Sequence, residues 1–255
     1  MKEKKEWIYS FFGRFYKEAW EGAGFLDKRD PEAEAAQILE LLSAPPGSHI
    51  LDWCGGWGRH AIPLAKMGFR VTILDFCAEY LQEAGQKAKE LGVQIETVEA
   101  DFRNTPPEIQ ADYAVNLFTA GLGYLGREND LIALNSLSKA LKPGALFLID
   151  TANLFWIAKN FQSKSWSESV DGKRRLLERR SFDFFSGVIV SSVIYQDTEL
   201  GIEEANSFSL RTYSPVEFKE ILESVGFKPL KLYGGLDGSD FSFESKRLVM
   251  VSQRP

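Results

Sequence analysis

The sequence predicts an α/β protein with a doubly wound, mostly parallel sheet of seven strands, and three observations carry this prediction. Short apolar segments alternate with segments of helical periodicity from about residue 46 to residue 150. These apolar segments are continuous, as is typical of strands that are buried on both faces of a parallel sheet. Residues 151–212 instead hold β-branched and aromatic segments separated by glycine turns, which predicts an antiparallel β insertion.

Residues 1–45 are predicted to form an N-terminal helical cap. Residues 7–20 carry aromatic side chains at roughly helical spacing, which predicts a helix. At Asp30-Pro31-Glu32, a carboxylate that can cap a helix precedes a proline that suits the first helical turn. We therefore expect a second helix that runs to about Ser43.

Residues 46–150 are predicted to form the core domain. Gly68 and Gly92 follow the first two helical segments, and Lys142-Pro143-Gly144 forms a turn before the last strand. The predicted strands are residues 49–53, 70–75, 94–98, 113–117 and 145–150, and the predicted helices are residues 57–67, 78–91 and 128–141.

Residues 151–212 are predicted to form the antiparallel insertion, and residues 213–255 are predicted to complete the core sheet. Ser214-Pro215 places a serine cap before a proline and so opens a helix that ends at Gly226. The strands of the insertion are expected near residues 165–170, 174–185, 188–196 and 203–212, and the last two core strands at residues 227–233 and 247–253.

Composition excludes several classes of protein. The net charge of -6 argues against a nucleic-acid partner, because binding phosphates needs a basic face. The sequence has no run of 18 apolar residues, so we expect no membrane span, and its charged start does not resemble a secretory signal. Two cysteines, Cys54 and Cys77, cannot build a disulfide framework, which favours a cytoplasmic protein.

Polar side chains follow successive strands of the predicted sheet. Asp52 lies at the end of the first strand, before the glycine-rich turn Cys54-Gly55-Gly56, and Asp75 ends the second strand. An acid at this second position can accept hydrogen bonds from both hydroxyls of a ribose. After the third strand, Asp101 could bind an adenine amino group and Phe102 could cover the base, and Asn116 ends the fourth strand. This pattern predicts a nucleoside-like ligand at the carboxyl ends of the strands.

With these motifs the chain resembles the class I S-adenosylmethionine-dependent methyltransferases, which have a Rossmann-like core. The resemblance rests on the following segments: Ile50-Leu51-Asp52-Trp53-Cys54-Gly55-Gly56-Trp57-Gly58, Thr72-Ile73-Leu74-Asp75, Glu99-Ala100-Asp101-Phe102, Asp112-Tyr113-Ala114-Val115-Asn116 and Leu141-Lys142-Pro143-Gly144-Ala145-Leu146-Phe147-Leu148. It covers about residues 10–150 well and the C-terminal segments loosely. One residue departs from the family pattern, since Cys54 stands where the family usually has glycine.

The resemblance implies roles for these residues. Asp52 and the backbone of Cys54, Gly55 and Gly56 would hold the methionine part of S-adenosylmethionine. Asp75 would bind the ribose, Asp101 and Phe102 the adenine, and Asn116 would line the methyl side. Phe76, directly after Asp75, and Tyr16 in the N-terminal cap are further expected cofactor contacts, and the insertion would act as a substrate lid.

Other polar residues have two interpretations each. His60 is more simply a packed histidine than a general base, and Tyr16 and Tyr9 lie in an aromatic stripe that can equally be core. Asp237 lies in a glycine-rich segment that can be an ordinary turn or can present a substrate ligand. The basic excess over residues 159–180 could attract an anionic substrate, although a solvated strand face is the simpler interpretation.

The function predicted from these observations is S-adenosylmethionine-dependent methyl transfer to an N or O nucleophile of a small molecule, by in-line displacement at the sulfonium methyl. No metal is expected, and the chain is expected to be a monomer or a homodimer. Three alternatives stay open at this point: a cofactor-binding protein without catalysis, a nicotinamide-dependent oxidoreductase, and an aminopropyl transferase.

Overall fold

The computed structural model describes residues 7–22 and 29–255, which divide into two compact units. The core unit contains Asp30–Lys159 and Tyr213–Pro255, and the insertion unit contains Asn160–Thr212 with the described residues up to Arg29. These boundaries differ from the predicted ones. Helix α3 (Pro31–Leu42) belongs to the core and not to an N-terminal cap, because it packs on the core sheet.

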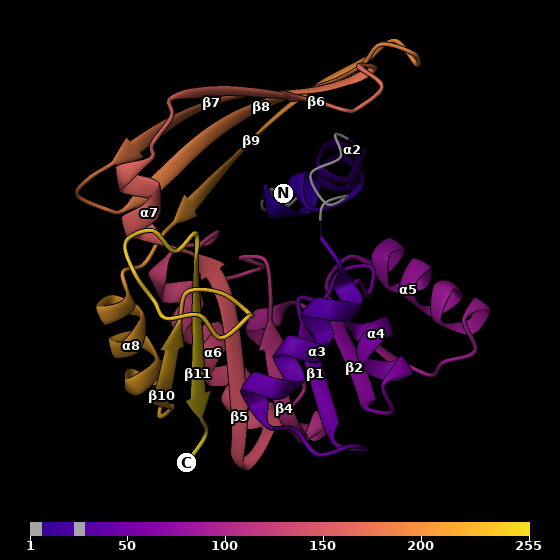
Figure 1. Cartoon of the computed structure of the whole chain (residues 1–255), viewed down its shortest axis with the longest axis vertical. Coiled ribbons are helices and arrows are strands. Elements are labelled where there is room, and N and C mark those ends of the chain that lie inside the picture. The colour runs from indigo at the N-terminus through magenta and orange to yellow at the C-terminus, as the bar shows by residue number, and fades with distance from the viewer. Residues whose placement is uncertain (1–6, 23–28) are drawn as a thin grey trace, which may run out of the picture. The chain divides into compact units, whose positions relative to one another are not determined.

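The core unit is built on a seven-stranded sheet of order β10-β11-β5-β4-β1-β2-β3 (Figure 1). Its strands are β1 (His49–Trp53), β2 (Arg70–Asp75), β3 (Glu96–Glu99), β4 (Ala111–Asn116), β5 (Leu141–Ala152), β10 (Lys228–Tyr233) and β11 (Arg247–Gln253). Strands β1 to β5 pair in parallel, and β11 runs antiparallel to both of its neighbours. The strand order reverses between β1 and β4, and ligands of doubly wound sheets bind at such a point, beyond the carboxyl ends of the strands. The predicted fold class is confirmed.

Helices cover both faces of this sheet. They are α3, α4 (Ala61–Lys66), α5 (Ala78–Glu90), α6 (Arg127–Ala140) and α8 (Pro215–Ser224). The short helix α7 (Leu154–Lys159) follows β5 and has no buried residue. Side chains of α3, α4 and α5 pack in one hydrophobic cluster, and those of α6 and α8 pack in another. Every residue of β1 is buried between the two clusters, which explains the continuous apolar character of this strand.

Several elements of the core differ from the prediction. Strand β5 begins at Leu141 and so includes Lys142-Pro143-Gly144, which were predicted as a turn, and β4 begins two residues earlier than predicted. The helix expected from Trp57 begins only at Ala61, because the preceding turn places Gly56 and Gly58 at φ angles of 56° and 77°. A side chain at Gly58 would also lie 3.1 Å from Ala84 and Ile73. Strand β3 begins two residues later than predicted, and helix α7 was not predicted.

The insertion unit contains a four-stranded antiparallel sheet and two N-terminal helices. Its elements are β6 (Lys164–Glu168), β7 (Arg174–Asp183), β8 (Val188–Asp197), β9 (Ile202–Arg211), α1 (Ile8–Phe11) and α2 (Arg14–Gly22). Phe11 and Phe15 pack on one face of the sheet, against Leu176, Val193 and Tyr195. The aromatic stripe is therefore core, but it forms two helices where one was predicted, since α1 ends at Phe12 with a ψ of 65°.

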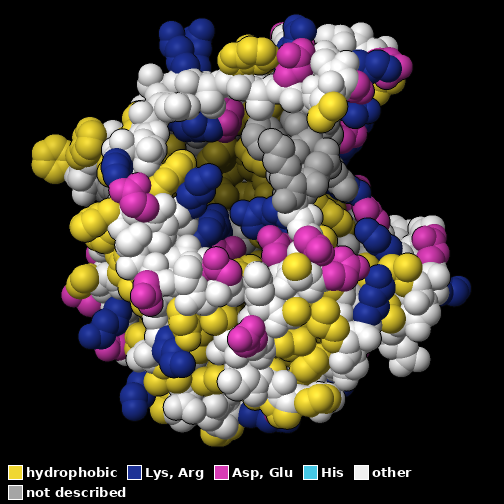
Figure 2. All heavy atoms as spheres, viewed as in Figure 1, with side chains coloured by type: hydrophobic (Ala, Val, Ile, Leu, Met, Phe, Trp, Pro, Cys, Tyr) yellow, Lys and Arg dark blue, Asp and Glu magenta, His cyan; other side chains and the backbone are white. Residues whose placement is uncertain are grey.

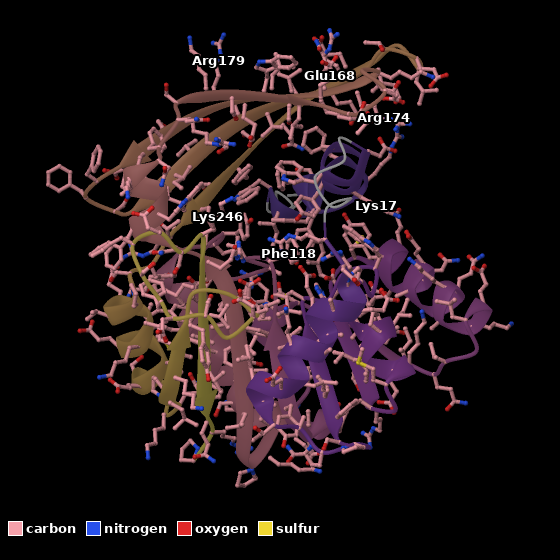
Figure 3. All side chains as sticks on the ribbon, viewed as in Figure 1. Lys17, Phe118, Glu168, Arg174, Arg179 and Lys246 are labelled. Carbon is pink, nitrogen blue, oxygen red and sulfur yellow. The ribbon has the colours of Figure 1, made fainter. Side chains whose placement is uncertain are left out.

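The basic residues of the insertion lie among acids of the same sheet. Arg175 pairs with Glu168 at 2.9 Å, and Arg174 pairs with Asp197 at 3.2 Å. Arg179 and Glu168 both lie on the exposed face (Figure 3). Cationic and anionic side chains also intermingle over the visible surface (Figure 2). This distribution is that of a solvated strand face.

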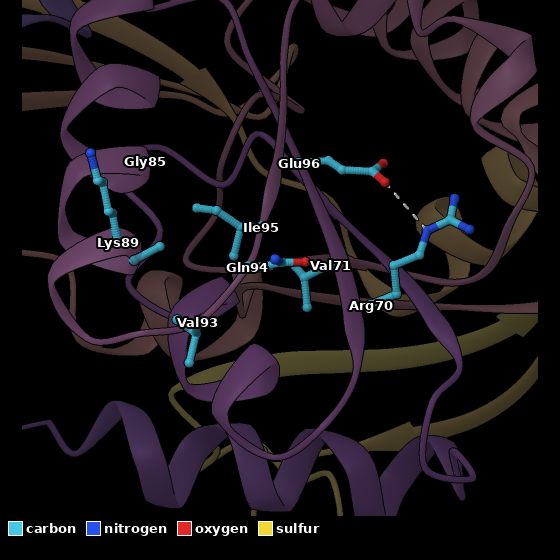
Figure 4. A pocket seen from close by; sticks show the side chains of 9 residues that line it. Arg70, Val71, Gly85, Lys89, Val93, Gln94, Ile95 and Glu96 are labelled. Atoms are coloured by element: carbon cyan, nitrogen blue, oxygen red, sulfur yellow. Dashed lines mark ion pairs between the residues drawn. The ribbon is translucent and has the colours of Figure 1, made fainter.

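One groove lies away from the carboxyl edge of the sheet. It has a volume of about 470 Å³ and lies between α5 and the amino ends of β2 and β3, where Arg70 and Glu96 approach to 3.6 Å (Figure 4). None of the predicted site residues lines this groove.

Over the described ranges, no helix combines the length and the apolar character that crossing a membrane requires.

The cap of α8 provides a test of local stability. The Ser214 side chain accepts a hydrogen bond from the Glu217 N–H at 3.2 Å, and the Glu217 carboxylate accepts one from the Ser214 N–H at 2.9 Å. Ser214→Ala should lower the free energy of unfolding by about 1 kcal/mol, measured by urea denaturation. Glu220→Ala, on the exposed face of the same helix, is the control and should change it by less than about 0.5 kcal/mol. Equal effects would contradict the capping role.

Candidate functional site

The carboxyl edge of the core sheet collects the polar residues that the sequence singles out. Asp52 lies near the end of β1, Asp75 ends β2, Asp101 follows β3 and Asn116 ends β4. The four strands are consecutive neighbours in the sheet, in the order β4-β1-β2-β3. Because they run in parallel, their carboxyl ends meet at one edge, as predicted.

The glycine-rich turn folds tightly against the ends of β1 and β2. The N–H groups of Cys54 and Gly55 both donate to the Leu74 carbonyl, at 2.8 and 3.2 Å. A Cβ atom at Gly55 would lie 2.6 Å from the Asp52 carboxyl carbon, so only glycine fits there. Cys54 has a φ of 65°, a left-handed conformation that is uncommon for a residue with a side chain.

Asp75 holds the turn from the end of β2. Its two carboxylate oxygens accept hydrogen bonds from the N–H groups of Gly56 and Cys77, each at 2.9 Å. Burial raises the pKa of this carboxyl, and the backbone hydrogen bonds oppose the shift. Each carboxylate oxygen can accept a second hydrogen bond, so Asp75 can still bind two hydroxyl groups.

Asp52 is an almost fully buried acid. It is 2% exposed, and its Oδ2 atom has no hydrogen-bond partner among the described residues. Burial raises its pKa to about 6, nearby Asp75 adds to the shift, and His60 and the Ala61 N–H oppose it. A buried acceptor without a partner is rare in folded proteins and indicates a ligand that donates to it.

Asn116 supplies a second acceptor of this kind on the neighbouring strand. Its side-chain amide donates to the Trp53 carbonyl at 2.8 Å, which leaves its Oδ1 atom without a partner in the described chain. The residue is completely buried. Two acceptors without partners in the described chain therefore lie at or near the carboxyl ends of adjacent strands.

Asp101 and Phe102 are engaged locally. The Asp101 carboxylate accepts hydrogen bonds from the Arg103 N–H at 2.8 Å and from the Arg103 guanidinium. Phe102 is 4% exposed and packs edge-on against Trp53 in the hydrophobic core. Contacts of these two residues with an adenine stay a prediction.

The other predicted cofactor contacts stay predictions as well. Phe76 is half-buried next to Asp75 in the core unit. Tyr16 belongs to the insertion unit, where its ring stacks on Trp20 with 5.1 Å between centroids. Asp237 accepts hydrogen bonds from the N–H and hydroxyl of Ser239, as an ordinary turn residue does.

His60 links two helices of the core. Its Nε2 atom lies 2.8 Å from a carboxylate oxygen of Glu34, and the Arg59 guanidinium donates to the same oxygen at 2.9 Å. The histidine is 5% exposed, and its ring packs near Phe118. This arrangement agrees with a packed histidine that joins α4 to α3, a partnership across 26 residues that the sequence did not reveal.

Sequence reasoning missed one part of this edge. Asp150, near the end of β5, is 1% exposed and accepts a hydrogen bond from Arg247 Nε at 2.6 Å. It also accepts one from the Phe118 N–H at 3.2 Å. The available signal was the position of Asp150, since it is a further acid at the end of a predicted strand.

Comparisons with known proteins agree with this geometry. Residues 50–144 match the model of the methyltransferase domain. These comparisons support a class I S-adenosylmethionine-dependent methyltransferase. The chain is 28% identical to the putative methyltransferase YqeM of Bacillus subtilis over 97% of either chain. It is also 28% identical to the glycine/sarcosine N-methyltransferase of Halorhodospira halochloris, over 83% of this chain and 80% of that protein.

A solved methyltransferase structure shares the fold of this chain. It is that of CalS10, an amino pentose methyltransferase from Micromonospora echinaspora, with a TM-score of 0.68 and 20% identity. The alignment covers 92% of this chain and 96% of CalS10. The methyltransferase core and the β insertion are thus both part of a fold that is already known.

The raised pKa of Asp52 predicts a pH dependence of stability. The folded chain holds this proton up to about pH 6, whereas the unfolded chain loses it near the ordinary value of 3.8. Since the folded state binds more protons in this window, the contribution of Asp52 to the free energy of unfolding falls as pH rises, by up to about 3 kcal/mol. Relative to the unmodified chain, Asp52→Asn should therefore gain stability between pH 4 and pH 7, measured by urea denaturation.

Asp237→Asn is the control for this experiment. The hydrogen bonds from Ser239 lower the pKa of Asp237, so its stabilising effect is lost only as pH falls below the ordinary range. This variant should show no gain between pH 4 and pH 7. An equal gain in both variants, or none in Asp52→Asn, would contradict the role of burial at Asp52.

The two histidines of the chain allow a matched test of His60. His60→Ala should bind S-adenosylmethionine like the unmodified chain and unfold more easily by roughly 1–3 kcal/mol, the range for a hydrogen bond to a charged group. His49→Ala is the control, because His49 is also buried and lies 2.8 Å from the Thr72 hydroxyl. A hundredfold loss of kcat in His60→Ala alone, with unchanged cofactor affinity, would show that His60 is the general base.

Proposed function

We propose that the protein transfers the methyl group of S-adenosylmethionine to a nitrogen or oxygen nucleophile of a small molecule. One observation carries this proposal: Asp52 Oδ2 and Asn116 Oδ1 are buried acceptors without partners in the described chain, at the ends of adjacent strands β1 and β4. The donor that they need is supplied by a ligand with a cationic amino group. The bound cofactor supplies an electrophilic sulfonium methyl, so the protein has to bind, orient and exclude water.

We assign the residues of the core unit to parts of the cofactor. Asp52 and Asn116 would bind the methionine amino group, and the turn of Cys54, Gly55 and Gly56 would border the methionine chain. Asp75 would accept the ribose hydroxyls with its two oxygens, of which Oδ2 already holds the turn through Gly56 and Oδ1 holds the Cys77 N–H. The same hydrogen bonds would then fix the turn and the ribose relative to each other.

The remaining assignments follow the sequence-based expectations. Asp101 and Phe102 would lie at the adenine, beside Phe76. The Asp101 carboxylate is held by Arg103, and so it would present a fixed acceptor edge to an adenine amino group.

An amine is the acceptor that the geometry supports best. An amine with a free lone pair needs desolvation and orientation but no general base, whereas a hydroxyl needs a base. The candidate base from the sequence analysis is His60, and its Nε2 atom lies 2.8 Å from a carboxylate oxygen of Glu34. Two of the similar proteins are named for amine substrates, glycine or sarcosine in one case and an amino pentose in the other.

We further propose that the protein works in the cytoplasm on a small, soluble acceptor and without nucleic acid. The net charge of -6 argues against a partner rich in phosphates, and cationic and anionic side chains intermingle on the face that Figure 2 shows. Whether the protein is a monomer or a homodimer can be measured by sedimentation velocity.

The ribose assignment gives the test of the proposed function. Asp75→Ala should weaken S-adenosylmethionine and S-adenosylhomocysteine binding by roughly 1–3 kcal/mol, or about 5- to 150-fold, measured by isothermal titration calorimetry. Asp112→Asn is the control, because Asp112 lies at the opposite end of β4 and pairs with Lys142. Turnover is followed as S-adenosylhomocysteine release with glycine, sarcosine and amino sugars as acceptors.

The outcomes separate the alternatives. Heat on titration with NAD and none with S-adenosylmethionine would replace the proposal with an oxidoreductase. Binding without methyl transfer to any acceptor would support a cofactor-binding protein without catalysis. Unchanged affinity in folded Asp75→Ala would refute the ribose role of this residue.

A further inference from the structure

We propose that Arg247 and Asp150 are positioning residues. They hold residues 117–123, called the 117–123 loop below, against the glycine turn of the cofactor site. This inference concerns the core unit alone. It rests on the proposed function only for the identity of the ligand in the test.

The loop begins in a conformation that its residues do not favour. Phe118 and Thr119 each have a φ of 63°, in the left-handed region. For two consecutive residues that are not glycine this is unusual, and for a β-branched residue such as Thr119 it is a genuine outlier. Such a conformation persists only where the surrounding structure holds it, and it is common in ligand sites.

Asp150 and Thr119 hold the backbone of the loop on β5. The Phe118 N–H donates to Asp150 Oδ2 at 3.2 Å, and the Thr119 N–H donates to the Asp150 carbonyl at 3.0 Å. The Thr119 hydroxyl accepts a hydrogen bond from the Ala152 N–H at 3.0 Å. Asp150 and Thr119 are both buried, so water does not compete for these hydrogen bonds.

Arg247, on β11, joins these groups into one network. Its Nε atom donates to Asp150 Oδ1 at 2.6 Å, and its Nη2 atom donates to the Asp150 carbonyl at 3.0 Å and to the Thr119 hydroxyl at 3.1 Å. The rigid fork of a guanidinium reaches three acceptors at once, which the single ammonium of lysine does not reproduce.

The Phe118 ring is held from two sides. The guanidinium carbon of Arg247 lies 5.9 Å from the ring centroid, and that of Arg59 lies 5.1 Å from it. Figure 3 shows Phe118 at the carboxyl edge of the core sheet. The cations and the ring attract each other, so Arg247 fixes the side chain of the loop as well as its backbone.

The far end of the loop is anchored independently. The Gly123 N–H donates to both carboxylate oxygens of Asp130, at 2.9 and 3.1 Å, and the Tyr213 hydroxyl donates to the same carboxylate. Asp130 is 1% exposed. Since both ends are fixed, the path of the loop between them is determined.

This path brings the 117–123 loop against the glycine turn. The loop starts directly after Asn116, and at Gly121 it passes so close to the turn that a Cβ atom there would lie 2.8 Å from the Cys54 sulfur. Arg247 and Asp150 therefore set the position of a segment that borders both Asn116 and Cys54. We infer that they act on ligand binding through this segment, without touching the ligand.

Matched variants test this inference. Thr119→Val removes the hydroxyl and keeps the branched shape, whereas Thr119→Ser keeps the hydroxyl. Arg247→Met removes the guanidinium, and Arg247→Lys keeps its charge. Arg70→Met is the control, because Arg70 pairs with Glu96 at the opposite end of the sheet. Each variant is examined by hydrogen–deuterium exchange of the 117–123 loop, by calorimetric titration with S-adenosylhomocysteine, and by its melting temperature.

We expect faster exchange and weaker binding in the same variants. In Thr119→Val and Arg247→Met, exchange in the loop should become at least about tenfold faster and S-adenosylhomocysteine affinity about tenfold lower. Thr119→Ser and Arg70→Met should stay within about twofold of the unmodified chain, and Arg247→Lys should lie between. A lower melting temperature with unchanged affinity would show a merely structural role and overturn the inference.

Failure of the inference is distinguishable from failure of the proposed function. If the unmodified chain binds no S-adenosylhomocysteine, the proposed function is wrong. In that case, unchanged hydrogen–deuterium exchange of the 117–123 loop in Arg247→Met would still refute the anchoring of this loop by Arg247. If the unmodified chain binds the ligand and neither Thr119→Val nor Arg247→Met alters exchange or affinity, only the inference is wrong.

Discussion

The contact between the glycine turn and the strand-end carboxylates is the constraint on which the site depends. Asp75 accepts hydrogen bonds from the Gly56 N–H in the turn and from the Cys77 N–H, which follows β2. Asp52 lies so close beneath the turn that no side chain fits at Gly55. The backbone of the turn and the two acids therefore form one unit, and the position of any ligand at this edge of the sheet is set by it.

This unit is unfavourable for folding in the absence of a ligand. Asp52 and Asp75 are both buried, and burial raises the pKa of both carboxyl groups. Desolvation and the unpartnered oxygens of Asp52 and Asn116 each cost free energy, because a buried acceptor without a donor loses its hydrogen bonds to water. Under the proposed function, a ligand that donates to these oxygens would offset this cost.

The sequence predicted those parts of the fold and site that depend on local pattern. The bounds of β1 and β2 are as predicted, because each strand is a short, mostly apolar segment that ends in an acid or an aromatic residue next to a turn. The acids Asp52 and Asp75 could be found because their place at a strand end is readable from the chain. The partnerships of His60 with Glu34 and of Asp150 with Arg247 could not, since they span 26 and 97 residues and depend on how the helices and strands pack.

Packing also accounts for the one departure from the family motif. Cys54 adopts a left-handed conformation, which costs roughly 1–2 kcal/mol relative to glycine. Its sulfur lies 2.8 Å from the position that a Cβ atom of Gly121 would take, so a side chain at Cys54 is matched by the absence of one at Gly121. The side chain at this contact is therefore that of Cys54 in the turn, and the 117–123 loop has glycine there. Two close backbone segments then need only one glycine at their point of contact, and the thiol, whose pKa is raised by burial, stays neutral and acts as a small apolar group.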